Sequence, residues 1–499
     1  MDGRDAPVTM TTMTGVLDPE ALARSVGHIF EDDALAALTE YATIPNLSPD
    51  FDPDWAAHGH MDSAAKLLLA WSKARQIGGL SVELVTLEGR TPVLLCEIPP
   101  TPGAESAGTV LCYGHLDKQP PLGAWRDGLG PFSPVREGDR LYGRGTADDG
   151  YAVFAALTAI EASRSAGGAH ARCVVLIEAC EESGSPDLPP YLDALSERIR
   201  SPNLVICLDS GCVTYDRLWM TTSLRGNLVG TLRVDVLREA VHSGAAGGVV
   251  PSSFRVLRQL LSRVEDAATG EILLPEFHAA IPEGRRAETG AVAEEFGDAV
   301  AGRFPTVDGL RLTGDSPAEL LMNETWRPSL AVTGIDGLPA TRDGGNVLRP
   351  FTTAKLSFRL PPSCDAEAAL EAVRRAFATD PPEGAKVSFS GEAAAGWDAP
   401  PPAPWLAAAA DEASLAYFGS SVRSMGEGGS IPFMASLGQR YPDVQFLATG
   451  VLGPESNAHG PNEFLHIPTA KAVTSCVAHV LDAHARSGSP TVGVSGRSS

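Results

Sequence analysis

Four apolar runs of this chain lead directly into acidic or histidine side chains. The runs at residues 109–112, 173–177, 204–208 and 444–451 lack a polar face, so they predict parallel strands buried on both faces of a sheet. In an open α/β sheet, ligands bind outside the carboxyl ends of the strands. We therefore expect one site built from the acids and histidines near these ends: His115, Asp117, Asp148, Glu181, Glu182, Asp209 and His459.

Composition shifts along the chain predict two domains, because 499 residues are too many for one hydrophobic core. From residue 31 to 210, helical stretches alternate with apolar strands, a pattern typical of β-α-β sheets. Residues 228–236 and 354–359 instead alternate between polar and apolar types, as antiparallel strands with one wet face do. The Pro-rich stretch 397–404 predicts a linker back to the first pattern.

We therefore predict an α/β outer domain interrupted by an inserted middle domain. The outer domain comprises residues 1–220 and 405–499, and the inserted domain comprises residues 221–404. Residues 486–499 are rich in Ser and Gly, so we expect a disordered tail there.

Charge and hydropathy argue against several kinds of partner. The formal net charge of −23 disfavours nucleic acid and anionic membrane surfaces. The first residues lack the basic start and apolar core of a signal peptide, and no apolar run is long enough to cross a bilayer. We expect a cytoplasmic protein whose eight cysteines are mainly reduced core thiols, with Cys180 placed where it could line a site.

The side chains after the strands meet the requirements of a pair of divalent metal ions. Two ions about 3.5 to 4 Å apart need a bridging carboxylate, further carboxylate or imidazole ligands on each side, and an open position for water. Glu181 and Glu182 follow an apolar strand and precede Ser183. On extended backbone their carboxylates would point in opposite directions, so that one could bind metal while the other handles protons.

Seven short motifs, all in the same order, resemble those of the M20 family of metallopeptidases, and most closely its carnosinase-type dipeptidase branch. The resemblance spans roughly residue 32 to the last helix. The motifs are Gly114–Asp117, Tyr142–Gly150, Glu181–Ser185, Leu208–Ser210, His242–Gly244, Gly428–Pro432 and Asn457–His459. The resemblance implies a zinc-peptidase-like catalytic domain with a mixed, mainly parallel sheet flanked by helices, plus an inserted α+β lid and dimerisation domain.

The same resemblance implies a role for each residue of the site. Five residues would hold two metals, with Asp148 bridging them, His115 and Asp209 on one metal, and Glu182 and His459 on the other. Glu181 would be the general base that takes a proton from the attacking water. Asp117 would accept a hydrogen bond from the His115 imidazole and fix its orientation, and the Asp148–Asp149 peptide would be cis.

In this family the inserted domain contributes to the active site of a homodimer. His242 resembles the lid histidine that enters the partner subunit's site and stabilises the oxyanion of the reaction. Arg359 would hold the terminal carboxylate of the substrate, together with the backbone of Gly429 and Ser430. The implied cofactor is two divalent ions per subunit, with zinc expected and manganese or cobalt as alternatives.

The chain departs from the family pattern just after Asp148 and Asp149. Many members continue with lysine and glycine, whereas this chain has Gly150 and Tyr151. A basic group expected near the metals is therefore missing, which leaves substrate preference open. Lys118, in the turn after Asp117, is a candidate for supplying that charge.

These observations predict a di-metal amide hydrolase. We expect a dipeptidase or carboxypeptidase that acts on a short substrate with a free carboxylate. An N-acyl-amino-acid deacylase, or an amidase that tailors a small metabolite, would use the same metals and base, so it stays an alternative. A non-catalytic relative that serves as a binding module would have lost the base or a ligand, whereas all six positions are present.

Overall fold

The chain divides into two compact units in the computed structural model, which describes residues 16–297, 299–302 and 306–487. Unit 1 comprises residues 1–221, 400–424 and 436–499, and unit 2 comprises residues 222–399 and 425–435. The predicted domain boundaries place residues 425–435 in the outer domain. In the structure these residues belong to unit 2, where Nε of Arg225 donates a hydrogen bond to the carbonyl oxygen of Gly428 (3.1 Å).

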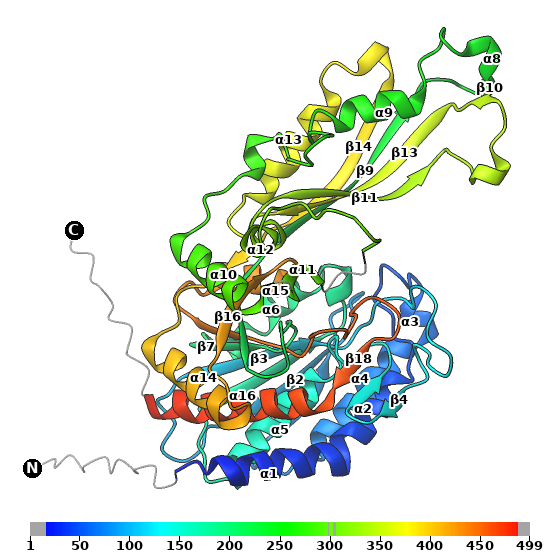
Figure 1. The fold of residues 1–499 in the computed structure, drawn as a ribbon. Coiled ribbons are helices and arrows are strands. Elements are labelled where there is room, and N and C mark those ends of the chain that lie inside the picture. The colour runs from blue at the N-terminus through cyan, green and yellow to red at the C-terminus, as the bar shows by residue number, and fades with distance from the viewer. Residues whose placement is uncertain (1–15, 298, 303–305, 488–499) are drawn as a thin grey trace, which may run out of the picture. The chain divides into compact units, whose positions relative to one another are not determined.

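The core of unit 1 is a six-stranded sheet with the order β1-β2-β6-β3-β7-β17 (Figure 1). The strands are β1 Ser81–Val85, β2 Val93–Ile98, β3 Thr109–His115, β6 Arg172–Glu178, β7 Leu204–Cys207 and β17 Gln445–Ala448. The pairs β3/β6, β3/β7 and β7/β17 are parallel, whereas β1/β2 and β2/β6 are antiparallel. The mixed, mainly parallel sheet predicted from the sequence is therefore confirmed.

The register of the parallel strands brings their carboxyl ends to one edge of the sheet. In the pairing of β3 with β6, His115 lies opposite Glu178, and in the pairing of β3 with β7, Tyr113 lies opposite Cys207. Every residue of β3 is buried, which explains its uninterrupted apolar start. The chain therefore delivers the residues that follow β3, β6 and β7 to the same edge.

Helices from both ends of the chain pack together beside this sheet (Figure 1). They are α1 Pro19–Ile29, α5 Ala152–Ser165, α14 Pro404–Tyr417 and α16 Ile467–Ser487. Eleven residues of α5 are buried, because this alanine-rich helix contacts β3, β6 and α16. The packing of α16 on α1, α5 and α14 ties the last part of unit 1 to the first.

A small antiparallel sheet with the order β18-β5-β4 flanks the two loops that carry Asp148 and His459. The strands are β4 Val135–Glu137, β5 Arg140–Tyr142 and β18 Phe464–His466. Asp148 lies in the loop after β5, and His459 lies in the loop before β18. The other elements of unit 1 are the π-helix Phe30–Ala34, α2 Leu35–Ala42, α3 Trp55–His58, α4 His60–Lys73, the 3-10 turn Glu181–Ser183, α6 Leu188–Ala194 and α7 Ser196–Ile199.

Unit 2 contains a four-stranded antiparallel sheet with the order β11-β13-β9-β14. The strands are β9 Gly226–Asp235, β11 Ser329–Asp336, β13 Phe351–Leu360 and β14 Lys386–Ala394. Buried and partly exposed residues alternate along β9, so one face packs on α9 Ser253–Leu261 and α13 Ala366–Ala378. Leu232, Leu356 and Phe377 belong to the resulting core.

The remaining elements of unit 2 are helices, turns and short strands. They are β10 Val241–His242, α8 Ser243–Ala246, the 3-10 turn Pro275–Phe277, α10 Glu283–Phe296, α11 Ala299–Gly302, α12 Pro317–Thr325, the 3-10 turn Thr341–Asp343, β12 Val347–Leu348 and the 3-10 turn Pro382–Gly384. β8 Trp219–Leu224, β15 Trp397–Asp398, β16 Arg423–Glu427 and α15 Pro432–Arg440 complete the chain.

Two segments differ from what the sequence predicted. The expected linker begins with the short strand β15, which pairs with β8. The expected tail overlaps α16, which continues through Ser487, while residues 488–499 lie outside the described part of the chain.

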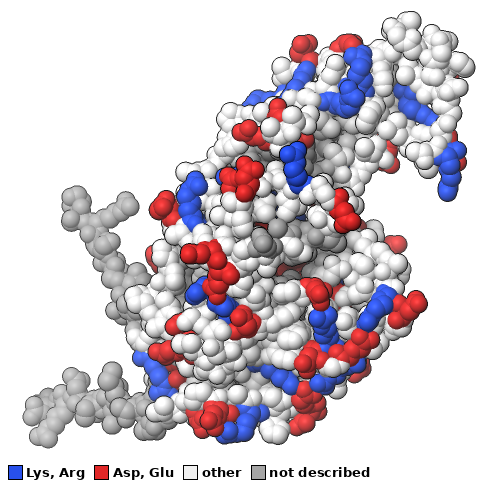
Figure 2. Space-filling model, viewed as in Figure 1, with Lys and Arg blue, Asp and Glu red and all other residues white. Residues whose placement is uncertain are grey.

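Surface and core chemistry agree with the composition. Figure 2 shows acidic and basic side chains interspersed over the viewed face. No helix in the described part of the chain combines the length and the apolar character that a membrane span requires. All eight cysteines are free thiols, and Cys180 is buried with its Sγ 3.5 Å from Oε2 of Glu178.

Candidate active site

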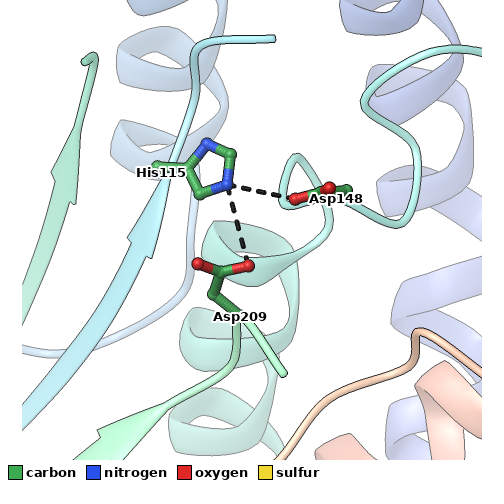
Figure 3. Close-up of side chains that lie close together, drawn as sticks. All are labelled: His115, Asp148 and Asp209. Carbon is green, nitrogen blue, oxygen red and sulfur yellow. Dashed lines mark hydrogen bonds and ion pairs between the residues drawn. The ribbon is translucent and has the colours of Figure 1, made fainter. Parts of the chain in front are cut away.

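One cluster of possible metal ligands lies at the carboxyl ends of β3 and β7. Nε2 of His115 is 3.2 Å from Oδ1 of Asp148 and 3.7 Å from Oδ1 of Asp209 (Figure 3). The ligand atoms of the three residues all lie within 4.8 Å of one another. We call His115, Asp148 and Asp209 the inner group; all three are buried.

A second cluster shares Asp148 with the first. Nε2 of His459 is 3.1 Å from Oδ2 of Asp148 and 3.3 Å from Oε2 of Glu182. Their ligand atoms also lie within 4.8 Å of one another. We call Asp148, Glu182 and His459 the outer group, because the side chain of His459 is 54% exposed.

The donor set of the two groups fits two divalent cations. Oδ1 of Asp148 faces the inner group and Oδ2 faces the outer group, as a bridging carboxylate requires. Oε1 of Glu182 is buried without a hydrogen-bond partner in the described residues, so it is available to a cation. Imidazole nitrogens and carboxylate oxygens are ligands of zinc and of similar ions. The metal-binding roles of these residues stay predictions that this geometry favours.

The loop that carries Asp148 packs tightly against the end of β3. The Asp148–Asp149 peptide is cis, as the resemblance implied. Oδ2 of Asp149 accepts the backbone N–H of His115 (3.2 Å). A Cβ atom at Gly114 would lie 2.6 Å from this oxygen and 2.4 Å from the Cβ of Ala152. Only glycine therefore lets β3 approach the loop this closely.

Asp117 orients the site in a different way from the one predicted. Nδ1 of His115 lies 3.1 Å from the main-chain oxygen of Asp117, while the nearer carboxylate oxygen is 3.5 Å away. The carboxylate instead accepts the N–H groups of Glu181 (3.1 Å) and Glu182 (3.0 Å). Asp117 therefore uses its carbonyl to orient the imidazole and its side chain to fix the neighbouring turn.

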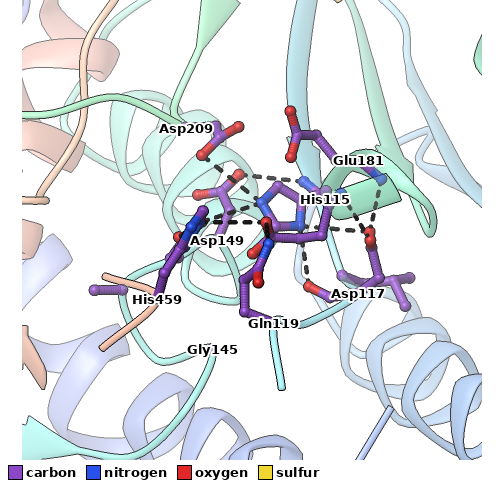
Figure 4. Close-up of polar contacts among 12 residues, drawn as sticks. His115, Asp117, Gln119, Gly145, Asp149, Glu181, Asp209 and His459 are labelled. Atoms are coloured by element: carbon purple, nitrogen blue, oxygen red, sulfur yellow. Dashed lines mark hydrogen bonds and ion pairs between the residues drawn. The ribbon is translucent and has the colours of Figure 1, made fainter. Parts of the chain in front are cut away.

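Glu181 and Glu182 do not lie on extended backbone, so that part of the prediction was wrong. They begin a 3-10 turn over Glu181–Ser183. The carboxylate of Asp117 stabilises this turn by accepting the backbone N–H groups of both glutamates. Only Glu182 reaches the outer group. Figure 4 shows the side chain of Glu181 beside those of His115 and Asp209, and its carboxylate accepts no hydrogen bond from another described residue.

Burial and mutual charge shift the pKa values of the site. Burial alone would lower the pKa of His115, but the charge of Asp209 and the nearby carboxylates of Asp117 and Asp148 raise it well above its usual value. Burial raises the pKa of Asp209 to about 6. The pKa of His459 reaches about 11, because its hydrogen bonds to Asp148 and Glu182 outweigh burial. Without metal, the carboxylates therefore hold protons on the imidazoles, and a bound cation must displace them.

The pKa of Glu181 lies above the ordinary range of a glutamate, as suits a proton acceptor. Burial raises the pKa of its carboxyl group, and the negative charge of Asp209 raises it further. A general base works best when its pKa approaches the operating pH. Glu181 lies beside His115 and Asp209 (Figure 4) but belongs to neither group, and this position suits that role.

The positions that depart from the family pattern are closely packed. A Cβ atom at Gly150 would lie 2.3 Å from the carbonyl oxygen of Gly145 and 2.3 Å from Cε1 of Tyr41, so no larger side chain fits. Lys118 lies nearby, but its Nζ donates to the carbonyl oxygens of Tyr41 (2.9 Å) and Ile44 (2.8 Å). Its ammonium therefore contacts backbone oxygens and not the ligand carboxylates. Burial lowers its pKa well below the usual value.

Three residues that contact the site were missed at the level of sequence. Gln119 donates from Nε2 to Oε2 of Glu182 (2.6 Å). Arg144 and Glu463 form a buried ion pair beside Asp148. Arg144 lies within a quoted motif and Glu463 follows His459 by four positions, so the only available signal was their nearness to predicted ligands.

The other candidates lie in unit 2. His242 ends β10, is exposed, and accepts the N–H of Gly244 at Nδ1 (3.0 Å). Arg359 lies on β13 and is partly buried, which lowers its pKa. Gly429 and Ser430 follow Gly428, the residue whose carbonyl Arg225 binds. A Cβ atom at Gly429 would meet nothing within 4 Å.

A comparison with protein families matches residues 111–483 to the peptidase family M20/M25/M40. The matched range covers most of the chain and contains every predicted ligand. The chain belongs to this family. The predicted membership is thereby confirmed, and so is the prediction of a metal-dependent hydrolase.

Two curated relatives of this M20 member are named as dipeptidases. It is 28% identical over 383 residues to the cysteinylglycine-S-conjugate dipeptidase of Corynebacterium striatum, which covers 73% of this chain and 80% of the relative. It is 24% identical over 461 residues to the Cys-Gly metallodipeptidase dug1 of Schizosaccharomyces pombe, covering 88% and 92%.

Solved structures show the same fold. The dipeptidase Dug1p of Saccharomyces cerevisiae has a TM-score of 0.76 at 23% identity, with 94% of the M20 chain and 98% of Dug1p covered. Human carnosine dipeptidase 1 has a TM-score of 0.74 at 23% identity, with 94% and 99% covered. At this identity the likeness concerns the fold alone.

Proposed function

We propose that this protein hydrolyses the peptide bond of dipeptides or other short substrates with a free carboxylate, using two divalent ions. The observation that carries the proposal is the pair of ligand groups joined by the two oxygens of Asp148. The dipeptidase names of its curated relatives support the choice of substrate class.

The residues around the two groups supply the proton chemistry of the reaction. When bound, the two ions would polarise the scissile carbonyl and lower the pKa of a water molecule. Glu181 accepts the proton of that water as its oxygen attacks the carbonyl carbon, and then donates the proton to the leaving nitrogen. Asp117 keeps Glu181 in place by accepting its backbone N–H.

Arg359 is the proposed anchor for the substrate carboxylate. Its guanidinium forms no hydrogen bond or ion pair with another described residue, so it is available to a ligand. A planar guanidinium can hold a carboxylate through two parallel hydrogen bonds. In the same unit, Arg225 fixes Gly428 and thereby the backbone of Gly429 and Ser430, the predicted partners in this contact.

We further propose a homodimer in which His242 acts on the partner's substrate. The edge strand β11 of unit 2 exposes Val332 and Ile335, each 45% accessible. An unpaired edge with exposed apolar side chains favours association with a second chain. His242 is exposed on its short strand, so it is free to stabilise a developing negative oxygen.

Zinc is the proposed metal, with manganese and cobalt as alternatives, since mixed nitrogen and oxygen ligands do not separate these ions sharply. A cytoplasmic location also stays a prediction, which cell fractionation would test. Both are independent of the proposed reaction.

The decisive experiment is hydrolysis of a mixed panel by metal-stripped protein to which zinc, manganese or cobalt is returned. The panel contains free-amino dipeptides and N-acetyl or N-succinyl amino acids, with released amine read by mass spectrometry. Metal-dependent cleavage of dipeptides is the expected result. Cleavage confined to N-acyl compounds would replace the proposal with the deacylase alternative.

A further inference from the structure

A buried ion pair lies between the loops that carry Asp148 and His459, and belongs to neither ligand group. Arg144 is 1% exposed and Glu463 is 0% exposed, and Nη1 of the arginine donates to Oε2 of the glutamate. Such a pair is costly to bury unless further hydrogen bonds satisfy both partners. The contacts of each partner therefore indicate what the pair does.

Glu463 holds the backbone of the Asp148 loop. Its Oε1 accepts the N–H groups of Gly145 (3.0 Å), Ala147 (3.3 Å) and Asp148 itself (3.3 Å). Its main-chain oxygen accepts the N–H of Gly143 (3.0 Å). One carboxylate thus fixes the peptide from which the shared ligand projects.

Arg144 holds the loops next to the other two outer ligands. Its Nη2 donates to the carbonyl oxygens of Gly460 (2.9 Å) and Pro120 (3.2 Å). Gly460 directly follows His459, whose φ of 64° is unfavourable for a residue with a side chain. Pro120 directly follows Gln119, whose amide donates to Glu182.

The hydrogen bonds of the pair act mainly on the outer ligands. They reach Asp148, which both groups share, and the neighbours of His459 and Glu182, but none of them involves His115 or Asp209. The latter two residues are placed by β3 and β7. Two of the three inner ligands, His115 and Asp209, therefore have a support that does not depend on the pair, whereas Asp148 is common to both groups.

We propose that Arg144 and Glu463 are positioning residues that set the spacing of the outer ligands, and hence the affinity for the outer ion. The inference rests on the proposed two-ion function and adds that the pair affects the outer ion more than the inner ion. Loss of the pair weakens the outer ion about 10- to 100-fold, the range for partners that orient metal ligands, and weakens the inner ion less, because only Asp148 of the inner group contacts the pair.

The test is calorimetric titration of the metal-stripped full-length protein with zinc, followed by metal content after dialysis against a graded chelator. Glu463→Gln removes the charge that binds Arg144. Arg144→Lys keeps a positive charge but cannot reach three acceptors in a planar fork. Both variants are expected to lose more affinity for the second zinc than for the first.

Two further variants keep the test decisive. If Glu463→Gln does not fold because it leaves Arg144 unpaired, the double variant Arg144→Met/Glu463→Gln removes both charges and is expected to show the same selective loss. Glu178→Gln is the matched control, because Glu178 is equally buried but hydrogen-bonds to Tyr113 (2.6 Å) and Ser185 (2.9 Å). It is expected to show no selective loss of the second zinc.

The outcomes separate the inference from the function on which it rests. A parent protein that binds fewer than two zinc ions contradicts the two-ion function. A parent that binds two ions, with variants that lose both equally or lose neither, overturns only the role of Arg144 and Glu463. Selective loss of the second ion in the pair variants, but not in the control, supports it.

Discussion

The inner and outer groups share one aspartate, yet the chain holds their other ligands in different ways. In the inner group, His115 ends a buried strand and Asp209 follows another, and their side chains are 0% and 8% exposed. In the outer group, Glu182 lies in a 3-10 turn and His459 in a loop. Strand ends in a core open rarely, whereas loops open readily, so we expect the inner ion to bind more tightly and the outer ion to exchange first.

This difference shows how one carboxylate can serve a rigid and an adjustable site. The strands of unit 1 fix where the first ion binds. The outer ligands depend on loop contacts, and His459 adopts a left-handed backbone conformation that those contacts must maintain. We therefore expect substitutions to separate the two groups according to the element that carries each ligand.

The largest effect is expected at Glu181, which belongs to neither group. Glu181→Ala should lower kcat about a thousandfold, the range for a general base, while two ions stay bound. Kinetics on a cleaved dipeptide and metal content per subunit check both statements. Activity within about tenfold of the parent, or less than about 1.4 kcal/mol of lost transition-state stabilisation, would contradict the assignment.

Substitution of the two histidines should separate the groups directly. His459→Ala removes an outer ligand, so about one ion per subunit should remain after dialysis against a chelator. His115→Ala removes an inner ligand and should weaken the ion that the His459 variant retains. Each substitution should lower metal affinity by more than the roughly 10- to 100-fold expected when a residue that only hydrogen-bonds to a ligand is lost. Identical affinity profiles for the two variants would remove the distinction between the groups.

A smaller effect is expected where the Asp148 loop is tightly packed. Gly150→Ala places a Cβ atom 2.3 Å from a backbone oxygen, so it should lower the free energy of unfolding by about 1 to 3 kcal/mol. Denaturant unfolding of the metal-free protein measures this change. Gly27→Ala in α1, where a Cβ meets nothing within 4 Å, is the control and should not destabilise. Equal stability of both variants would show that the loop adjusts freely.

The smallest effect concerns pH in the metal-free protein. The folded pKa of His459, about 11, lies above its unfolded value, so its protonated form stabilises the fold at pH 6. That contribution falls as pH rises from the unfolded value of about 6.5 toward the folded value. We expect Tm to fall between pH 7 and 9, and less so in His459→Gln. An unchanged slope in the variant would assign the pH dependence to other groups.

The sequence predicted the strand ends better than the turns between them. Buried apolar runs that stop at His115 and Asp209 fix both the sheet and the position of these side chains, because the parallel register has few alternatives. The turn at Glu181 was misread as extended, since two adjacent acids carry no periodicity that separates a strand from a 3-10 turn.

Contacts made by backbone atoms were beyond the reach of sequence patterns. The carbonyl oxygen of Asp117 orients His115, and any residue type has such an oxygen. Glu463 accepts three N–H groups from a loop that is more than 300 positions earlier in the chain. A single acid in a polar loop gives no signal of burial, so its partner Arg144 could not be paired with it either.

The discontinuity of unit 1 has a consequence for synthesis on the ribosome. The edge of β7 that pairs with β17 stays without this partner strand while the whole of unit 2 is synthesised, because β7 ends at Cys207 and β17 begins at Gln445. At about 5 to 20 residues per second this interval lasts roughly 10 to 50 seconds. During that time an apolar strand and the surface that α16 later covers stay open to other nascent chains. Chaperone binding to the growing polypeptide should therefore peak before residue 445 emerges and decline once α16 has packed.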